Sequence, residues 1–159
     1  MPVGLVTCAY GASTIESWIR QKALEPHPQF KELLQTFSKK CVTFRDDPKQ
    51  FLNYGNALAK STGGKSPKNP DPYQDQHNPF VLHNGMIAPI APYAIRGAIW
   101  YQGESNMNTR KLYPDLQQTL IEDWRTLWGN SELPFYFVQL AITGSPPARL
   151  FIELQAIRP

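Results

Sequence analysis

The chain has 159 residues, of which 42% are hydrophobic, 12% aromatic and 18% charged. A domain of this size buries roughly 70% of the surface that its unfolded chain exposes, so the composition predicts one folded domain and excludes a disordered tail. No apolar run approaches the roughly 20 residues that a membrane-spanning helix needs. The net charge of +3 comes from scattered basic residues, which argues against a nucleic-acid partner.

The N-terminal quarter predicts a strand, a tight loop and a helix. Residues 3–10 are apolar and β-branched, as in a buried parallel strand. The small residues 11–14 then form a loop, and Ser13 or Thr14 can cap a helix that ends before Pro26. Cys8 is expected as a buried free thiol, although a disulfide with the second cysteine stays open. Residues 1–20 contain no secretory signal pattern.

Two amphipathic helices are predicted next, over residues 30–37 and from 46 to 58. The composition of residues 61–79 changes to Ser, Gly, Lys, Asn, Asp and Pro, which predicts a long loop. A short helix should follow over residues 80–89.

The last third predicts strand, helix, strand. Residues 97–101 and 134–140 are apolar strands, and residues 111–128 repeat leucine and tryptophan every three or four positions up to the helix stop at Gly129. Such alternation indicates right-handed crossovers and a parallel sheet with helices on its faces, an α/β fold. Residues 150–154 begin an unfinished element.

Two polar loops are the candidate site. Ligands of open parallel sheets bind at the carboxyl ends of strands, so residues 11–14 and 102–106 should lie side by side. The first loop presents backbone N–H groups that suit a carboxylate, a phosphate or a developing oxyanion, or it is an ordinary capped helix start. In the second, Gln102, Glu104 and Asn106 serve either catalysis or a structural network, and Glu104 needs a partner there.

Other chemistries have no motif here. Ser105 lacks the second glycine of a G-x-S-x-G elbow, and no P-loop, dinucleotide fingerprint or H-E-x-x-H occurs. The three histidines and two cysteines lack metal-ligand spacing. We expect neither a metal nor a cofactor.

Four stretches resemble the sialate O-acetylesterase family of the SGNH-hydrolase superfamily, which is related to acetyl-xylan esterases. They are Tyr-Gly-Ala-Ser-Thr-Ile-Glu-Ser-Trp at 10–18, Leu-His-Asn-Gly-Met-Ile at 82–87, Ile-Trp-Tyr-Gln-Gly-Glu-Ser-Asn at 99–106, and Asp-Trp-Arg to Trp-Gly at 123–129. The resemblance implies a three-layer flavodoxin-like fold. It also implies hydrolysis of acetyl esters on sugars, notably 9-O-acetyl sialic acid, by a Ser nucleophile with an Asp-x-x-His pair.

The resemblance also implies roles for single residues. Gly11 and Gln102 would form the oxyanion hole, with Glu104 as its support. Substrate-binding positions would be Ser13, Asn84, Ser105 and Asn106. The partner would be an acetylated sugar, with a homo-oligomer or missing flanking sequence possible. Family members are often secreted, periplasmic or lysosomal. The residues themselves do not indicate the compartment of this chain.

The sequence departs from the family pattern at several positions. Ala12 stands where the family has a second glycine, and His83 where a tyrosine is common. Neither a Gly-Gln-Ser-Asn block, which carries the nucleophile, nor an Asp-x-x-His pair occurs in residues 1–159; Asp75 and His77 are one position too close. We therefore interpret residues 1–159 as one partial domain that keeps the oxyanion loops.

Two alternatives remain beside the esterase. The first is a non-catalytic module that binds carbohydrate, with Tyr10, Trp18, Trp100 and Tyr101 as candidates for stacking on sugar rings, although aromatic side chains at such positions often belong to the core. The second is an inactive truncated gene product.

Overall fold

A computed structural model describes residues 3–47, 49–61, 66–138, 140 and 154–157 of the chain. Its helices are α1 (Gln21–Leu24), α2 (Lys31–Asp46), α3 (Lys49–Ala59) and α4 (Tyr113–Leu127), and its strands are β1 (Ala98–Trp100), β2 (Phe135–Val138) and β3 (Leu154–Ile157). Short 3-10 turns and one π-helical turn, His83–Ile87, connect them. Among these residues no helix has the length and hydropathy of a membrane span.

The sheet is small and mixed. β1 and β2 pair in parallel, with Ala98 opposite Phe135, and α4 lies between them in sequence, as the predicted crossover requires. The predicted parallel pairing is therefore confirmed for β1 and β2, and β3 adds to β2 an antiparallel strand that was not predicted. The α/β class, the strands at 98–100 and 135–138 and the helix ending at Gly129 are confirmed.

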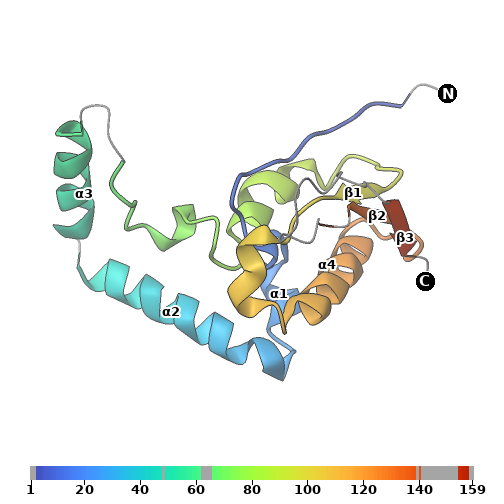
Figure 1. The fold of residues 1–159 in the computed structure, drawn as a ribbon, viewed down its shortest axis with the longest axis horizontal. Coiled ribbons are helices and arrows are strands. Elements are labelled where there is room, and N and C mark those ends of the chain that lie inside the picture. The colour runs from blue at the N-terminus through green and yellow to red at the C-terminus, as the bar shows by residue number, and fades with distance from the viewer. Residues whose placement is uncertain (1–2, 48, 62–65, 139, 141–153, 158–159) are drawn as a thin grey trace, which may run out of the picture.

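The predicted N-terminal strand is not formed. Residues 3–10 make neither helix nor strand, and Val3, Leu5 and Val6 are exposed, because the extended segment pairs with none of the three strands (Figure 1). A β-branched apolar run has the composition of a strand, but a strand forms only when a neighbouring strand accepts its hydrogen bonds. Cys8 is accordingly half-buried, and it is a free thiol.

The core lies between α4 and one face of the sheet. Leu116 and Leu120 of α4 are fully buried, and Trp124 meets Trp100 of β1 edge to face with ring centroids 6.0 Å apart. Trp100 in turn meets Trp18 at 5.9 Å. Helical spacing on α4 and alternation on β1 direct these apolar side chains to the same interior.

The other face of the sheet is open in the described part of the chain. Ile99 and Tyr136 are register partners on that face, and they are 65% and 39% exposed. The expected arrangement of helices on both faces is therefore seen on one face only, where α4 packs.

Two helices and the proline-rich segment project from the sheet and α4 (Figure 1). The helix predicted over 30–37 is confirmed and continues through Asp46, and the helix predicted from 46 to 58 is confirmed as α3. α3 buries none of its residues. The loop predicted over 61–79 is confirmed for its described residues apart from one 3-10 turn, Pro72–Gln74, and the helix predicted over 80–89 appears as the π-helical turn.

Candidate functional site

The two loops that the sequence singled out lie side by side. We call residues 11–14 loop A and residues 102–106 loop B. The side-chain amide of Gln102 donates to the carbonyl oxygen of Ser13 at 2.8 Å, which joins the loops directly. Loop B follows β1, so the prediction of a polar cluster at the carboxyl end of this strand is confirmed. The loops meet even though no strand precedes loop A.

Asn106 is the centre of the hydrogen-bond network, and it is 1% exposed. Its Oδ1 accepts from the backbone N–H of Ile15 at 3.0 Å and from Nε2 of Gln102 at 2.8 Å. Its Nδ2 donates to Oε2 of Glu16 at 2.9 Å and to the hydroxyl of Thr109 at 3.0 Å. All the hydrogen-bonding capacity of one buried amide is thus used to fix the two loops.

Tyr113, the first residue of α4, fixes Gln102 from the other side. Its hydroxyl lies 2.9 Å from the carbonyl oxygen of Gln102 and 3.0 Å from Oε1 of the same residue. Burial raises the pKa of the Tyr113 hydroxyl above its usual value, so it stays protonated and can donate. Both Nε2 hydrogens of Gln102 are already engaged, one by Ser13 and one by Asn106.

Loop A has a strained turn at its tip. Ala12 has a φ of +55°, in the left-handed region that costs an L-residue about 1–2 kcal/mol. The backbone thus adopts the conformation that a glycine would favour, with alanine in place of glycine. Gly11 is exposed, with no atom within 4 Å of the position a Cβ would take, so its backbone faces open space. Ser13 is buried, and its Oγ accepts from the indole N–H of Trp18 at 3.1 Å.

Loop B turns at a glycine that cannot be replaced without strain. Gly103 has a φ of +151°, and a Cβ there would lie 2.7 Å from Cδ1 of Leu140. Glu104 is exposed, and its carboxylate raises the pKa of Tyr101 by accepting the phenol's hydrogen bond. Ser105 is half-buried. The side-chain bond between the loops thus comes from Gln102, and Asn106 ties loop B to Ile15 and Glu16 just after loop A.

Asn84 lies apart from this cluster. It is exposed at the π-helical turn, and its Oδ1 is 3.3 Å from Nδ1 of His83. Its side chain lines a surface cavity together with residues of α1 and α2. His83 is buried, and desolvation lowers its pKa below the usual value, so the imidazole is neutral at pH 7. Its Nε2 has no hydrogen-bond partner among the described residues.

Three residues of the network were not singled out as site residues from the sequence. Glu16 is 5% exposed, Tyr113 bridges α4 to loop B, and the hydroxyl of Thr109 accepts from Nδ2 of Asn106 at 3.0 Å. An acidic residue in the first turn of a helix is usually solvated. Glu16 is buried because its carboxylate accepts from Asn106, and no local pattern reveals a partner 90 positions away.

Within the described ranges, no group of three or more His, Cys, Asp or Glu side chains is placed to hold a metal ion. The chemistry that the loops can perform is hydrogen-bond donation from a fixed backbone. An exposed glycine amide and a preorganised side-chain amide, both next to the core, suit a developing negative charge on oxygen.

Known proteins share this chain's pattern. The model of the carbohydrate esterase family described as sialic acid-specific acetylesterase matches residues 62–157. Sialate O-acetylesterase of Rattus norvegicus is 31% identical, and that of Homo sapiens is 32% identical; each match covers 88% of this chain. The chain spans 26% of the rat protein and 22% of the human one, about a quarter of their length. No solved structure matches the chain.

Proposed function

Because the chain belongs to the carbohydrate esterase family of sialic acid-specific acetylesterases, we propose that it supplies the oxyanion-binding part of an enzyme that removes acetyl groups from sugars, with O-acetylated sialic acid as the substrate. One observation carries the proposal. The amide of Gln102 donates to Ser13 of loop A and to Asn106 of loop B at 2.8 Å each, so it joins the two loops that carry the proposed donors.

In the proposed reaction the acetyl carbonyl becomes tetrahedral and its oxygen gains charge. Gly11 would donate its backbone N–H, and Gln102 would donate an N–H of its side chain. Removing one such donor costs about 3–4 kcal/mol of barrier in well-measured enzymes. Both Nε2 hydrogens of Gln102 are engaged, so the amide would give up its bond to Ser13 or to Asn106 when it donates to the oxyanion. The hydroxyl of Tyr113 would stay bonded to Oε1.

The nucleophile and base are proposed to come from outside residues 1–159. Ser13 is unsuited as a nucleophile because its Oγ is buried and bonded to Trp18. Glu104 acts in this proposal through Tyr101 at the rim, and Ser105 and Asn106 shape the second loop. We further propose that residues 1–159 are one partial domain of the three-layer flavodoxin-like type, in which a further layer covers Ile99 and Tyr136.

The first experiment tests activity. The isolated chain should hydrolyse p-nitrophenyl acetate little above background, because triad residues act as a unit and their loss leaves small residual catalysis. Ser105→Ala should leave that rate unchanged; a rate abolished by Ser105→Ala overturns the proposal.

The second experiment tests the assembly. The flanking DNA should encode Gly-Gln-Ser-Asn upstream and Asp-x-x-His downstream in frame, and the longer protein should deacetylate O-acetylated sialic acid. In that protein Gln102→Ala should lower kcat about 100- to 1000-fold. Flanks without these blocks, or an unchanged kcat, would favour the inactive gene product or a binding role.

A binding function without catalysis has one observation in its favour. Trp18 and Trp100 are core residues, but Tyr10 and Tyr101 are 50% and 59% exposed, each one residue before a site loop. Calorimetry with O-acetylated sialic acid and with xylan tests it. Saturable binding without turnover, lost in Tyr10→Ala and Tyr101→Ala, supports this second function, and no binding at millimolar ligand excludes it.

A further inference from the structure

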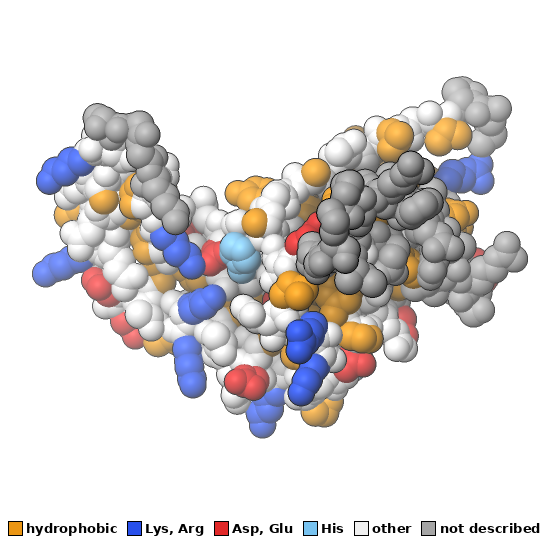
Figure 2. Space-filling view, viewed as in Figure 1, with side chains coloured by type: hydrophobic (Ala, Val, Ile, Leu, Met, Phe, Trp, Pro, Cys, Tyr) orange, Lys and Arg blue, Asp and Glu red, His pale blue; other side chains and the backbone are white. Residues whose placement is uncertain are grey.

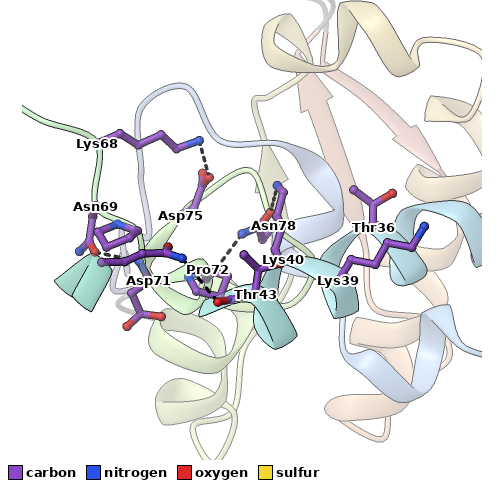
Figure 3. A pocket seen from close by; sticks show the side chains of 12 residues that line it. Thr36, Lys39, Lys40, Thr43, Lys68, Asn69, Asp71, Pro72, Asp75 and Asn78 are labelled. Carbon is purple, nitrogen blue, oxygen red and sulfur yellow. Dashed lines mark hydrogen bonds and ion pairs between the residues drawn. The ribbon is translucent and has the colours of Figure 1, made fainter. Parts of the chain in front are cut away.

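A cavity of about 520 Å³ lies between α2 and the proline-rich loop, and none of its lining residues belongs to loop A or B. Figure 3 shows Thr36 and Lys39 at one end, Asn69 and Asp71 at the other, and Lys40 with Asn78 between them. Apart from prolines, the lining side chains carry hydroxyl, amide, ammonium or carboxyl groups. These polar groups can bond the hydroxyls of a sugar, while the prolines and the aliphatic stems of the lysines can pack against its ring.

Of the two carboxylates that line the cavity, only Asp75 is paired with a cation among the described residues, and the three lining lysines leave an excess of positive charge. Oδ1 of Asp75 accepts from the backbone N–H of His77 at 3.0 Å and lies 2.7 Å from Nδ1 of the His77 ring. Its Oδ2 pairs with Nζ of Lys68 at 3.1 Å. These hydrogen bonds and Lys68 hold the pKa of Asp75 at about 2 against the opposing effect of burial. Asp71 accepts from the backbone N–H of Tyr73.

Among the described residues, no carboxylate pairs with Lys40 in this way. Its Nζ donates to Oδ1 of Asn78 at 2.6 Å, and Asn78 is 2% exposed and donates to the carbonyl oxygen of Pro72 at 2.7 Å. A buried neutral amide thus positions an ammonium group without neutralising it, and two of its N–H bonds remain for a ligand. Lys39 adds a second ammonium group on the same helix wall.

We propose that this cavity is a binding site for a sugar that carries a carboxylate, with the ammonium group of Lys40 on the carboxylate and the hydroxyl and amide walls on the sugar hydroxyls. The ligand class rests on the proposed function, whereas the site lies outside the acetyl-binding loops. One backbone bond connects the two places: Gln76, between Asp75 and His77, accepts from the N–H of Thr14 in loop A. An acidic sugar held here would be a neighbour of the acetylated one.

The experiment is a titration of the 159-residue chain, followed by amide chemical shifts, with glucuronic acid, N-acetylneuraminic acid, its neutral methyl ester and glucose 6-phosphate. The two carboxylates should shift residues of α2 and the 68–78 segment and saturate at millimolar concentration. Raising NaCl from about 50 to 500 mM should weaken binding several-fold, because salt screens exposed charges. Equal binding of the methyl ester, or tighter binding of the phosphate, overturns the proposal.

Variants separate this site from the esterase. Lys40→Met keeps the aliphatic stem and should weaken binding at least about tenfold, while Lys40→Arg should retain most of it and Lys22→Met on α1 should change nothing. Circular dichroism reports whether each variant folds. Wild-type affinity in folded Lys40→Met overturns the site. Hydrolysis of p-nitrophenyl acetate, which has neither sugar nor carboxylate, should be the same in all of them, so failure of either proposal leaves the other intact.

Discussion

The side-chain amide of Asn106 donates to the buried carboxylate of Glu16 at 2.9 Å, across 90 positions of sequence. The same side chain also accepts from the backbone of Ile15, so a single residue connects loop B to the turn that follows loop A.

Replacing this residue should cost far more than an average substitution. Asn106→Ala leaves the buried N–H of Ile15 and the carboxylate of Glu16 without their partner, and we expect the free energy of unfolding to fall by about 3 kcal/mol. Urea unfolding measures it. Asn84→Ala, at an exposed position, should change stability by less than about 0.5 kcal/mol. A cost at Asn106 as small as at Asn84 would contradict the network.

The alanine at the tip of loop A should be improvable. Ala12→Gly removes the strain of a left-handed φ, about 1–2 kcal/mol. It also raises the entropy of the unfolded chain, which costs about 0.4–1 kcal/mol of stability. The free energy of unfolding should therefore rise by about 0.5 kcal/mol. Thermal and urea unfolding test the sign. As a control, Ala57→Gly in the last turn of α3 should lower stability, by up to about 1 kcal/mol. Destabilisation by Ala12→Gly would rule out the positive φ.

A buried ion pair anchors α4 to the segment after loop A. Asp123 accepts from Nε of Arg20 at 2.6 Å and from its backbone N–H at 2.8 Å, and the two side chains are 1% and 14% exposed. Removing one partner of such a pair costs about 3–5 kcal/mol, and we expect a loss of about 3 kcal/mol for Asp123→Ala.

The exposed pair of Arg45 and Asp46 provides the matched comparison, since its side chains are 74% and 60% exposed. Asp46→Ala should change the free energy of unfolding by less than about 0.5 kcal/mol. Similar costs for the two aspartates would show that burial of the Arg20 pair does not matter.

The buried imidazole should make stability depend on pH. Desolvation lowers the pKa of His83 in the folded chain, whereas the unfolded chain has a pKa of about 6.5. The unfolded state therefore binds more protons between these values, and stability should be full above about pH 6.5 and fall as the pH drops below it. The relevant measurement is urea unfolding at pH 7.5 and pH 5.

His83→Gln removes the titrating group, and the difference in stability between the two pH values should shrink. His27→Gln leaves His83 in place and should keep the difference of the wild type. An unchanged pH dependence in His83→Gln would mean that another group is responsible.

Local patterns predicted the helices well and the sheet only partly. Leu116, Leu120 and Trp124 recur at helical spacing and are buried on one face, so α4 could be predicted from its own residues. The direction of β3 depends on its partner β2, which no pattern within residues 150–154 encodes. The run at 3–10 fails as a strand for the same reason, because pairing is a property of two segments.

The candidate site was predictable in place but not in detail. The pattern of an apolar strand followed by a polar loop located Gln102 and Asn106. The order of strand, helix and strand along the chain implied that loops A and B meet. The family resemblance implied Glu104 as the support of the loop, and the residues alone predicted that a charge there needs a partner. The structure instead leaves Glu104 exposed and makes the neutral amide of Asn106 the buried hub.

Loop A continues without a break into the 3-10 turn Ile15–Trp18, in which every residue is buried. The rigid wall of the site and the hydrophobic core are thus built from one stretch of backbone, and mutations there alter both together. Variation that retunes recognition while sparing the fold has room at the exposed rim, for example at Tyr10 and Tyr101. A mutational scan scored for protein abundance should therefore tolerate changes at these two tyrosines and reject them a few positions later.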